Sequence, residues 1–115
     1  MPVCSICGHV RTEDAHVKPR DTFDDRQDDL TGNIIPLCPT HHDEFDAGKI
    51  GILLSKTGFL VIEEGILKHY ESKMNLHHLR DEYVFERNQS CDLKLRLRLG
   101  MIASASYLRF DKPLS

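Results

Sequence analysis

The chain has 115 residues, of which 40% are hydrophobic, and a formal net charge of −3 at pH 7. A chain of this length fits one small domain, which buries so little surface that an added cross-link would stabilise it. The sequence has no apolar run long enough for a membrane-spanning helix and no secretory pattern at its start, so we expect a cytoplasmic protein without a membrane partner.

Two short strands and a long loop are expected in the first third of the chain. Residues 15–18 favour a strand, which Pro19 would end because proline donates no backbone hydrogen bond. Residues 20–32 carry five aspartates and lack apolar periodicity, which predicts a solvated loop closed by Gly32. Residues 33–37 favour a second strand, at an edge or an end of a sheet because it contains a proline.

A helix is expected over about residues 39–47. Pro39 suits the first helical turn, because its missing N–H would be unbonded there in any case. Asp43 and Glu44 favour the positive start of the helix, and Gly48 suits its C-terminal cap.

The next segment favours a β-hairpin followed by two helices. Residues 50–54 and 58–62 are apolar and flank the turn-forming residues 55–57. Weaker patterns predict helices over about 65–73 and 78–88.

The basic segment 93–99 fits two structures. Its strict alternation of apolar and basic residues is typical of a strand. Continued towards the C-terminus, the same segment also fits a helix that gathers Lys94, Arg98 and Arg109 on one face. We favour the helix over the strand.

Two short ligand pairs predict a structural zinc site. Cys4-x-x-Cys7 and Cys38-x-x-His41 each have the spacing that chelates one side of a tetrahedral Zn²⁺. The alternatives are unconnected loop cysteines or a redox pair, but the latter lacks the βαβ pattern that usually surrounds it. Cys91 has no partner at metal spacing and is expected to be a buried thiol.

Between and after the zinc pairs lie His16, Asn33, His42 and Asp46, in that order. With these residues, the runs AHVKP and GNIIPLCPTHHDEFDAGKI resemble the HNH endonuclease family over roughly residues 4–52. The resemblance implies an α+β fold with a small ββα-metal core stapled by zinc. We therefore expect an HNH core with the zinc site over residues 1–54, and a hairpin and helical extension of the same domain over 55–115.

The resemblance also implies a role for each of these residues. His16 would be the general base that deprotonates the attacking water, a task suited to an imidazole at neutral pH. Asn33 would orient His16 or pin the loop. His42 and Asp46 would share one helical face and hold a catalytic Mg²⁺ or Mn²⁺.

The sequence departs from the family pattern beside the general base. Many family members have Asp or His there, but this chain has Ala15, so one metal ligand is missing. Asp14 would lie on the same strand face as His16 and could not simply replace residue 15. Because Mg²⁺ often takes only one or two protein ligands, we expect His42 and Asp46 to suffice.

The favoured function is a metal-dependent endonuclease that hydrolyses DNA phosphodiester bonds. The alternative is a catalytically decayed zinc-ribbon module that binds nucleic acid or serves as an adaptor, for which Ala15 is the best sign. DNA is the expected partner, and a homodimer is left open. Residues 1–55 carry five basic against ten acidic side chains, so the DNA-facing surface is expected in the C-terminal segment. Its candidate contacts are Lys94, Arg96, Arg98 and Arg109.

Overall fold

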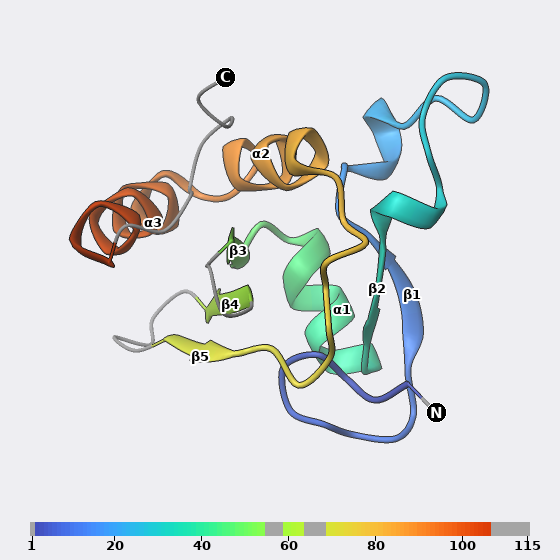
Figure 1. Ribbon diagram of the computed structural model, residues 1–115, viewed down its shortest axis with the longest axis horizontal. Coiled ribbons are helices and arrows are strands. Elements are labelled where there is room, and N and C mark those ends of the chain that lie inside the picture. Colours follow the sequence, from blue (N-terminus) through green and yellow to red (C-terminus); the bar gives the residue numbers. More distant parts are fainter. Residues whose placement is uncertain (1, 55–58, 64–68, 107–115) are drawn as a thin grey trace.

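The computed structural model describes residues 2–54, 59–63 and 69–106, which form two small antiparallel sheets with helices between and beside them (Figure 1). Strand β1 (Glu13–His16) pairs with β2 (Ile34–Leu37), with His16 opposite Ile34. Two short 3-10 turns, Arg20–Thr22 and Thr31–Asn33, lie in the loop between them. The second sheet has the strand order β3-β4-β5.

Strand β1 begins and ends two residues earlier than the sequence predicts. Its ladder stops after His16 because the backbone N–H of Lys18 donates to the side-chain oxygen of Asn33 instead of to a strand partner. The ladder reaches back to Glu13 because backbone pairing with β2 tolerates charged side chains on the exposed face. The strand was therefore expected in the right place, but its bounds were wrong.

Helix α1 (Pro39–Asp46) confirms the helix expected over 39–47. Cys38 is its N-cap and Pro39 opens its first turn. The chain leaves the helix through Gly48, whose φ of +79° lies in the left-handed region that glycine adopts without strain. The backbone N–H of Gly48 donates to the carbonyl of Phe45, which satisfies one of the last carbonyl groups of the helix.

The β-hairpin is confirmed as β3 (Ile50–Leu54) and β4 (Phe59–Glu63), with the turn outside the described residues. The helix expected over 65–73 is wrong, because β5 (His69–Glu71) forms a strand there and residues 64–68 lie outside the described part. β5 pairs with the edge of β4 that does not face β3, so the backbone groups along that edge of β4 are hydrogen-bonded. This pairing overrides the weak pattern of the segment itself.

The last two helices are α2 (Asp81–Gln89) and α3 (Leu93–Ser106), so the helix favoured for the basic segment is confirmed. Leu95 and Leu99 are buried, whereas Leu93 and Leu97 are 66% and 63% exposed. A strand would have placed all four leucines on one face, so this division is the signature of a helix. The helix expected over 78–88 corresponds to α2, which begins three residues later.

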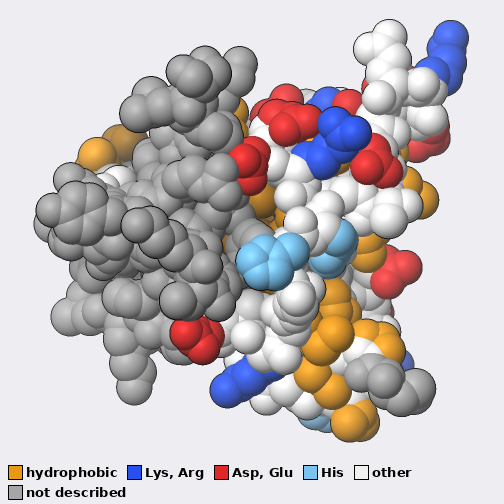
Figure 2. Space-filling view, viewed as in Figure 1, with side chains coloured by type: hydrophobic (Ala, Val, Ile, Leu, Met, Phe, Trp, Pro, Cys, Tyr) orange, Lys and Arg blue, Asp and Glu red, His pale blue; other side chains and the backbone are white. Residues whose placement is uncertain are grey.

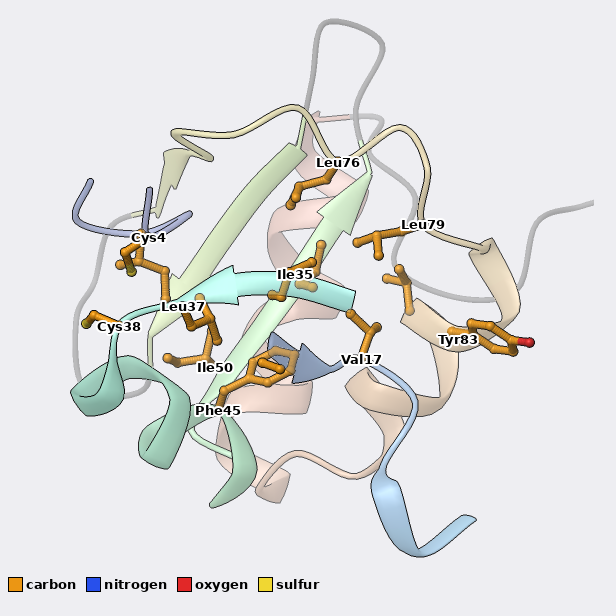
Figure 3. Packing of buried hydrophobic residues seen from close by; sticks show 14 residues of the cluster. Cys4, Val17, Ile35, Leu37, Cys38, Phe45, Ile50, Leu76, Leu79 and Tyr83 are labelled. Carbon is orange, nitrogen blue, oxygen red and sulfur yellow. The ribbon is translucent and has the colours of Figure 1, made fainter. Parts of the chain in front are cut away.

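The core lies around α1, which contacts the β1–β2 hairpin and β3, while α2 and α3 pack against β3. Phe45 of α1 is fully buried and lies close to Ile50, Val17 and the β2 side chains (Figure 3). Cys4 and Cys38 lie at one end of this cluster, and Tyr83 lies at the other. The expected α+β class is therefore confirmed, with β1, β2 and α1 as a ββα unit. Within the described residues, no helix is long and apolar enough to cross a membrane.

Candidate functional site

The two ligand pairs meet at the end of the core. The four ligand atoms of Cys4, Cys7, Cys38 and His41 all lie within 4.8 Å of one another. Nδ1 of His41 is 3.6 Å from Sγ of Cys4 and 3.3 Å from Sγ of Cys38, and the sulfurs of Cys7 and Cys38 are 3.9 Å apart. Tetrahedral zinc with bonds of about 2.0–2.3 Å keeps such atoms roughly 3.5–3.8 Å apart. The cluster therefore suits a zinc ion.

Local backbone structure prepares these thiols for a metal. The chain turns tightly after Cys4, whose carbonyl accepts a hydrogen bond from Gly8 at a φ of +79°. Burial alone would raise the pKa of the Cys4 thiol, but hydrogen bonds from the backbone of Cys7, Cys38 and Ile6 outweigh it and lower the pKa to about 6. The thiolate, which is the form that binds metal, is thus favoured at neutral pH.

A cleft of about 550 Å³ opens beside α1. It is bordered by β1, the turn after Pro19, α1 and one side chain of α2. His41 and His42 are adjacent on α1, and only His42 lines the cleft, so one helical turn connects the two sites. The lining residues are Asp14, His16, Pro19, Arg20, Asp21, His42, Asp46 and Arg87.

His16 is the last residue of β1 and is partly exposed to the cleft. Its ring packs edge-on against Phe23, with ring centres 5.4 Å apart. This contact limits the ring's rotation and leaves it accessible to solvent. An imidazole in this setting can exchange a proton with a molecule in the cleft.

Asn33 is fully buried and does not line the cleft. Its side-chain oxygen accepts the N–H of Lys18, and its backbone carbonyl accepts the N–H of Val17. Asn33 was predicted either to orient His16 or to pin the loop. In the structure its described hydrogen bonds go to the backbone that follows His16, and none goes to the His16 imidazole.

His42 lies between two carboxylates. Its Nδ1 is 2.9 Å from Oε1 of Glu13, and its Nε2 is 3.3 Å from Oδ2 of Asp46. Because a carboxylate only accepts, a proton on Nδ1 would be donated to Glu13. In that tautomer of the neutral ring, Nε2 presents a lone pair that faces the negative oxygen of Asp46. A second proton or a cation between these atoms would stabilise them.

The separation of these two atoms fits a shared cation. Neighbouring ligands of an octahedral Mg²⁺ lie roughly 3.0 Å apart when the bonds are about 2.1 Å. Ala15 is fully buried and points into the core, while Asp14 lines the cleft together with His16. Among the described residues, only Cys4, Cys7, Cys38 and His41 offer three or more ligand atoms within reach of one ion. His42 and Asp46 are therefore a two-residue candidate site, since Glu13 bonds the other ring nitrogen of His42.

Three residues at this site were missed by the sequence analysis. Glu13 lies before the predicted strand 15–18, and Arg20 lies within the predicted loop 20–32. Arg87 lies far away in the sequence, on a helix with no motif. Only Arg20, which follows the strand-ending proline next to the general-base candidate, carried a local signal. The other two contacts depend on how the chain folds back on itself.

Of the expected DNA contacts, Lys94 and Arg96 do not line the cleft, and the side chain of Arg98 lies outside the described part of the structure. Lys94 is exposed on α3, and the guanidinium of Arg96 donates to Gln89. Arg109 lies outside the described residues. No described residue of α3 lines the cleft. On the face shown in Figure 2, acidic and basic side chains of the described residues are mixed along one edge rather than forming a continuous basic field.

Comparison with known proteins agrees with this geometry. Residues 4–53 match the family model described as HNH endonuclease. No curated protein sequence is a significant match to the chain. The structure of a modification dependent TagI restriction endonuclease is similar, with a TM-score of 0.59 and 17% sequence identity over 77% of this chain.

The similarity to that structure concerns the fold, and this chain spans 33% of its length. The matched family segment contains both ligand pairs, β1, β2 and α1. Residues 4–53, somewhat less than half of the chain, are therefore similar to the HNH endonuclease family.

Proposed function

We propose that the protein is a metal-dependent endonuclease that hydrolyses phosphodiester bonds in DNA. The observation that carries this proposal is the position of His16, His42 and Asp46 around one open cleft. A proton acceptor and a cation-binding pair that face the same space are the two elements that hydrolysis of a phosphodiester needs.

The charges in the cleft also call for a cation. Three carboxylates, those of Asp14, Asp21 and Asp46, line it against the guanidinium groups of Arg20 and Arg87. A phosphate group entering this cleft would meet more negative than positive charge. A divalent ion would reverse that balance, which explains how a protein with a net charge of −3 can act on DNA.

In the proposed reaction, His16 accepts a proton from a water molecule whose oxygen attacks the phosphorus. The bond from phosphorus to the 3′ oxygen breaks, and that oxygen leaves with the electron pair and takes up a proton. His42 and Asp46 would hold Mg²⁺ or Mn²⁺, which supplies positive charge for the phosphate and the leaving oxygen. Arg20 is exposed at the cleft and would bind a phosphate oxygen of the DNA backbone.

Two residues position this machinery in the proposal. Glu13 fixes the tautomer of His42 by accepting the Nδ1 proton, which leaves Nε2 available to a metal. Asn33 pins the backbone after His16. A structural Zn²⁺ would be held by the cluster of Cys4, Cys7, Cys38 and His41. This ion would connect the N-terminal turn to the start of α1.

The alternative, a binding module that has lost catalysis, is supported by Ala15 at the position of a family ligand and by the two-residue metal site. Supercoiled plasmid incubated with the protein in Mg²⁺, Mn²⁺ or EDTA separates the two functions. A nuclease gives nicked or linear DNA with Mg²⁺ or Mn²⁺ and none with EDTA, whereas a binding module retards the plasmid without cutting it. Because the similar structure is of a modification dependent enzyme, the plasmid should be tested with and without methylation.

A further inference from the structure

Arg87 is the one side chain of α2 that lines the cleft, and it lies outside the matched family segment. It is only 3% exposed, and its guanidinium carbon lies 4.1 Å from the centre of the Phe45 ring. An arginine this deeply buried usually has a carboxylate partner. Here the described hydrogen bonds of the guanidinium go to backbone carbonyls instead.

Those hydrogen bonds connect the two elements that carry the candidate catalytic groups. Nη2 donates to the carbonyl of His16 at 2.7 Å, and Nε donates to the carbonyl of Val17 at 2.8 Å. Nη1 donates to the carbonyl of Phe45 at 3.0 Å. The planar guanidinium thus spans from the end of β1 to the residue that precedes Asp46 on α1.

The guanidinium charge is disfavoured by burial, which lowers the pKa of Arg87, and the carboxylates of Asp46 and Asp21 partly offset this effect. An apolar side chain of similar volume would leave the three backbone carbonyls without these donors. What an apolar side chain lacks is the rigid set of donors that holds three carbonyl groups at fixed separations.

We infer that Arg87 is a positioning residue, which holds His16 at a fixed distance from the His42 and Asp46 pair by clamping the backbone carbonyls of His16 and Phe45. The inference rests on the proposed nuclease function. It also assigns a task to the C-terminal extension, which supplies α2 and therefore completes a site built by the family segment.

The test compares two neighbouring buried residues of α2. Arg87→Met removes the clamp and keeps most of the volume. Asn88→Ala is the matched control, because the Asn88 side chain is fully buried and bonds the backbone N–H and carbonyl of Ile52 on β3, away from the cleft. Both variants lose buried hydrogen bonds, but only the first touches the backbone of His16.

With both variants assayed well below their melting temperatures, we expect kcat for plasmid nicking to fall by about 10 to 100-fold in Arg87→Met, the effect of a small misplacement of a catalytic group. KM for DNA should stay within about twofold, and Asn88→Ala should retain kcat within about threefold. Arg87→Lys, which can still donate to part of the carbonyl set, should give an intermediate kcat. An unchanged kcat in Arg87→Met, or an equal loss in Asn88→Ala, would overturn the inference.

A measurement that does not depend on nuclease activity separates this inference from the proposed function. The NMR signal of the His16 ring Cε1–H should shift in Arg87→Lys and stay in place in Asn88→Ala. If the wild-type protein does not cut DNA, the nuclease proposal fails while this signal still reports on the clamp. If Arg87→Met does not fold, Arg87→Lys provides both measurements, and an unmoved His16 signal in Arg87→Lys would contradict the positioning role.

Discussion

Removal of zinc from the Cys4, Cys7, Cys38 and His41 cluster should lower the melting temperature by about 15–20 °C. The sulfurs of Cys7 and Cys38 are 31 positions apart in sequence, so a shared metal closes a long loop in the unfolded chain. Loop closure of this length contributes about 3–4 kcal/mol in the chain-entropy picture. A small domain gains only about 5–15 kcal/mol from folding in total, and each kcal/mol is worth roughly 5 °C at this size.

The assay is thermal unfolding followed by circular dichroism, with zinc measured in the same samples before and after chelation. Readdition of Zn²⁺ should restore the original melting temperature, whereas Mg²⁺ should not. Cys38→Ser should lose zinc and destabilise the protein as chelation does. Cys91→Ser is the matched control, because Cys91 is also buried but bonds the carbonyls of Ile50 and Arg87, which a hydroxyl can replace.

A melting temperature that changes by less than about 3 °C after complete zinc removal would refute the loop-closure reasoning. The reasoning would also be refuted if Cys91→Ser destabilised the protein as strongly as Cys38→Ser. The loss of stability would then come from the buried thiol and not from the metal.

Further predictions concern the cleft, helix α3 and the long loop. Glu13→Gln should weaken the apparent Mg²⁺ or Mn²⁺ affinity by about 10 to 100-fold in nicking assays while kcat at saturating metal stays near wild type, and an unchanged affinity would remove Glu13 from the site. Arg20→Ala should lower the slope of log DNA affinity against log salt concentration by about 0.9, and a Lys94/Arg98 double alanine should lower it by nearly twice that amount. An unchanged slope would show that the substituted residues do not contact the DNA phosphates. The hydrogen bond from Lys18 lowers the pKa of Asp28 below its ordinary value of 3.8, so its stabilising effect is present above that pH and lost as the pH falls through the lowered pKa. The difference in urea midpoint between wild type and Asp28→Asn should therefore be constant from pH 7 to 5 and shrink below about pH 4; a constant difference at pH 3 would contradict the shift.

Features with a local cause could be predicted from the sequence. The candidate zinc ligands follow from two short spacings that a shared metal explains together, and the structure brings all four within reach of one ion. Helix α1 follows from Pro39 and Gly48, which favour its two ends. The choice of helix for the basic segment rested on a pattern that two structures fit, and burial of Leu95 and Leu99 decides it.

Features that depend on contacts outside the segment itself could not be predicted in this way. Strand β5 forms because β4 offers it an edge, although its own residues have no strand pattern. Glu13 meets His42 across 29 positions of sequence, and Arg87 meets His16 across 71. Nothing in the neighbourhood of these side chains marks them as parts of a site, because their partners are supplied only by the folded chain.

The central claim is tested most directly by single-turnover nicking with His16→Ala at saturating Mg²⁺, with zinc content and circular dichroism measured on the same preparation. The account predicts a rate about 10²–10⁴-fold below wild type, the usual cost of losing a general base, with folding, zinc and DNA affinity unchanged. His77→Ala, an exposed histidine that does not line the cleft, should cut at the wild-type rate. A His16→Ala protein that nicks within twofold of wild type, or an equal loss in His77→Ala, would contradict the assignment of the cleft as the active site.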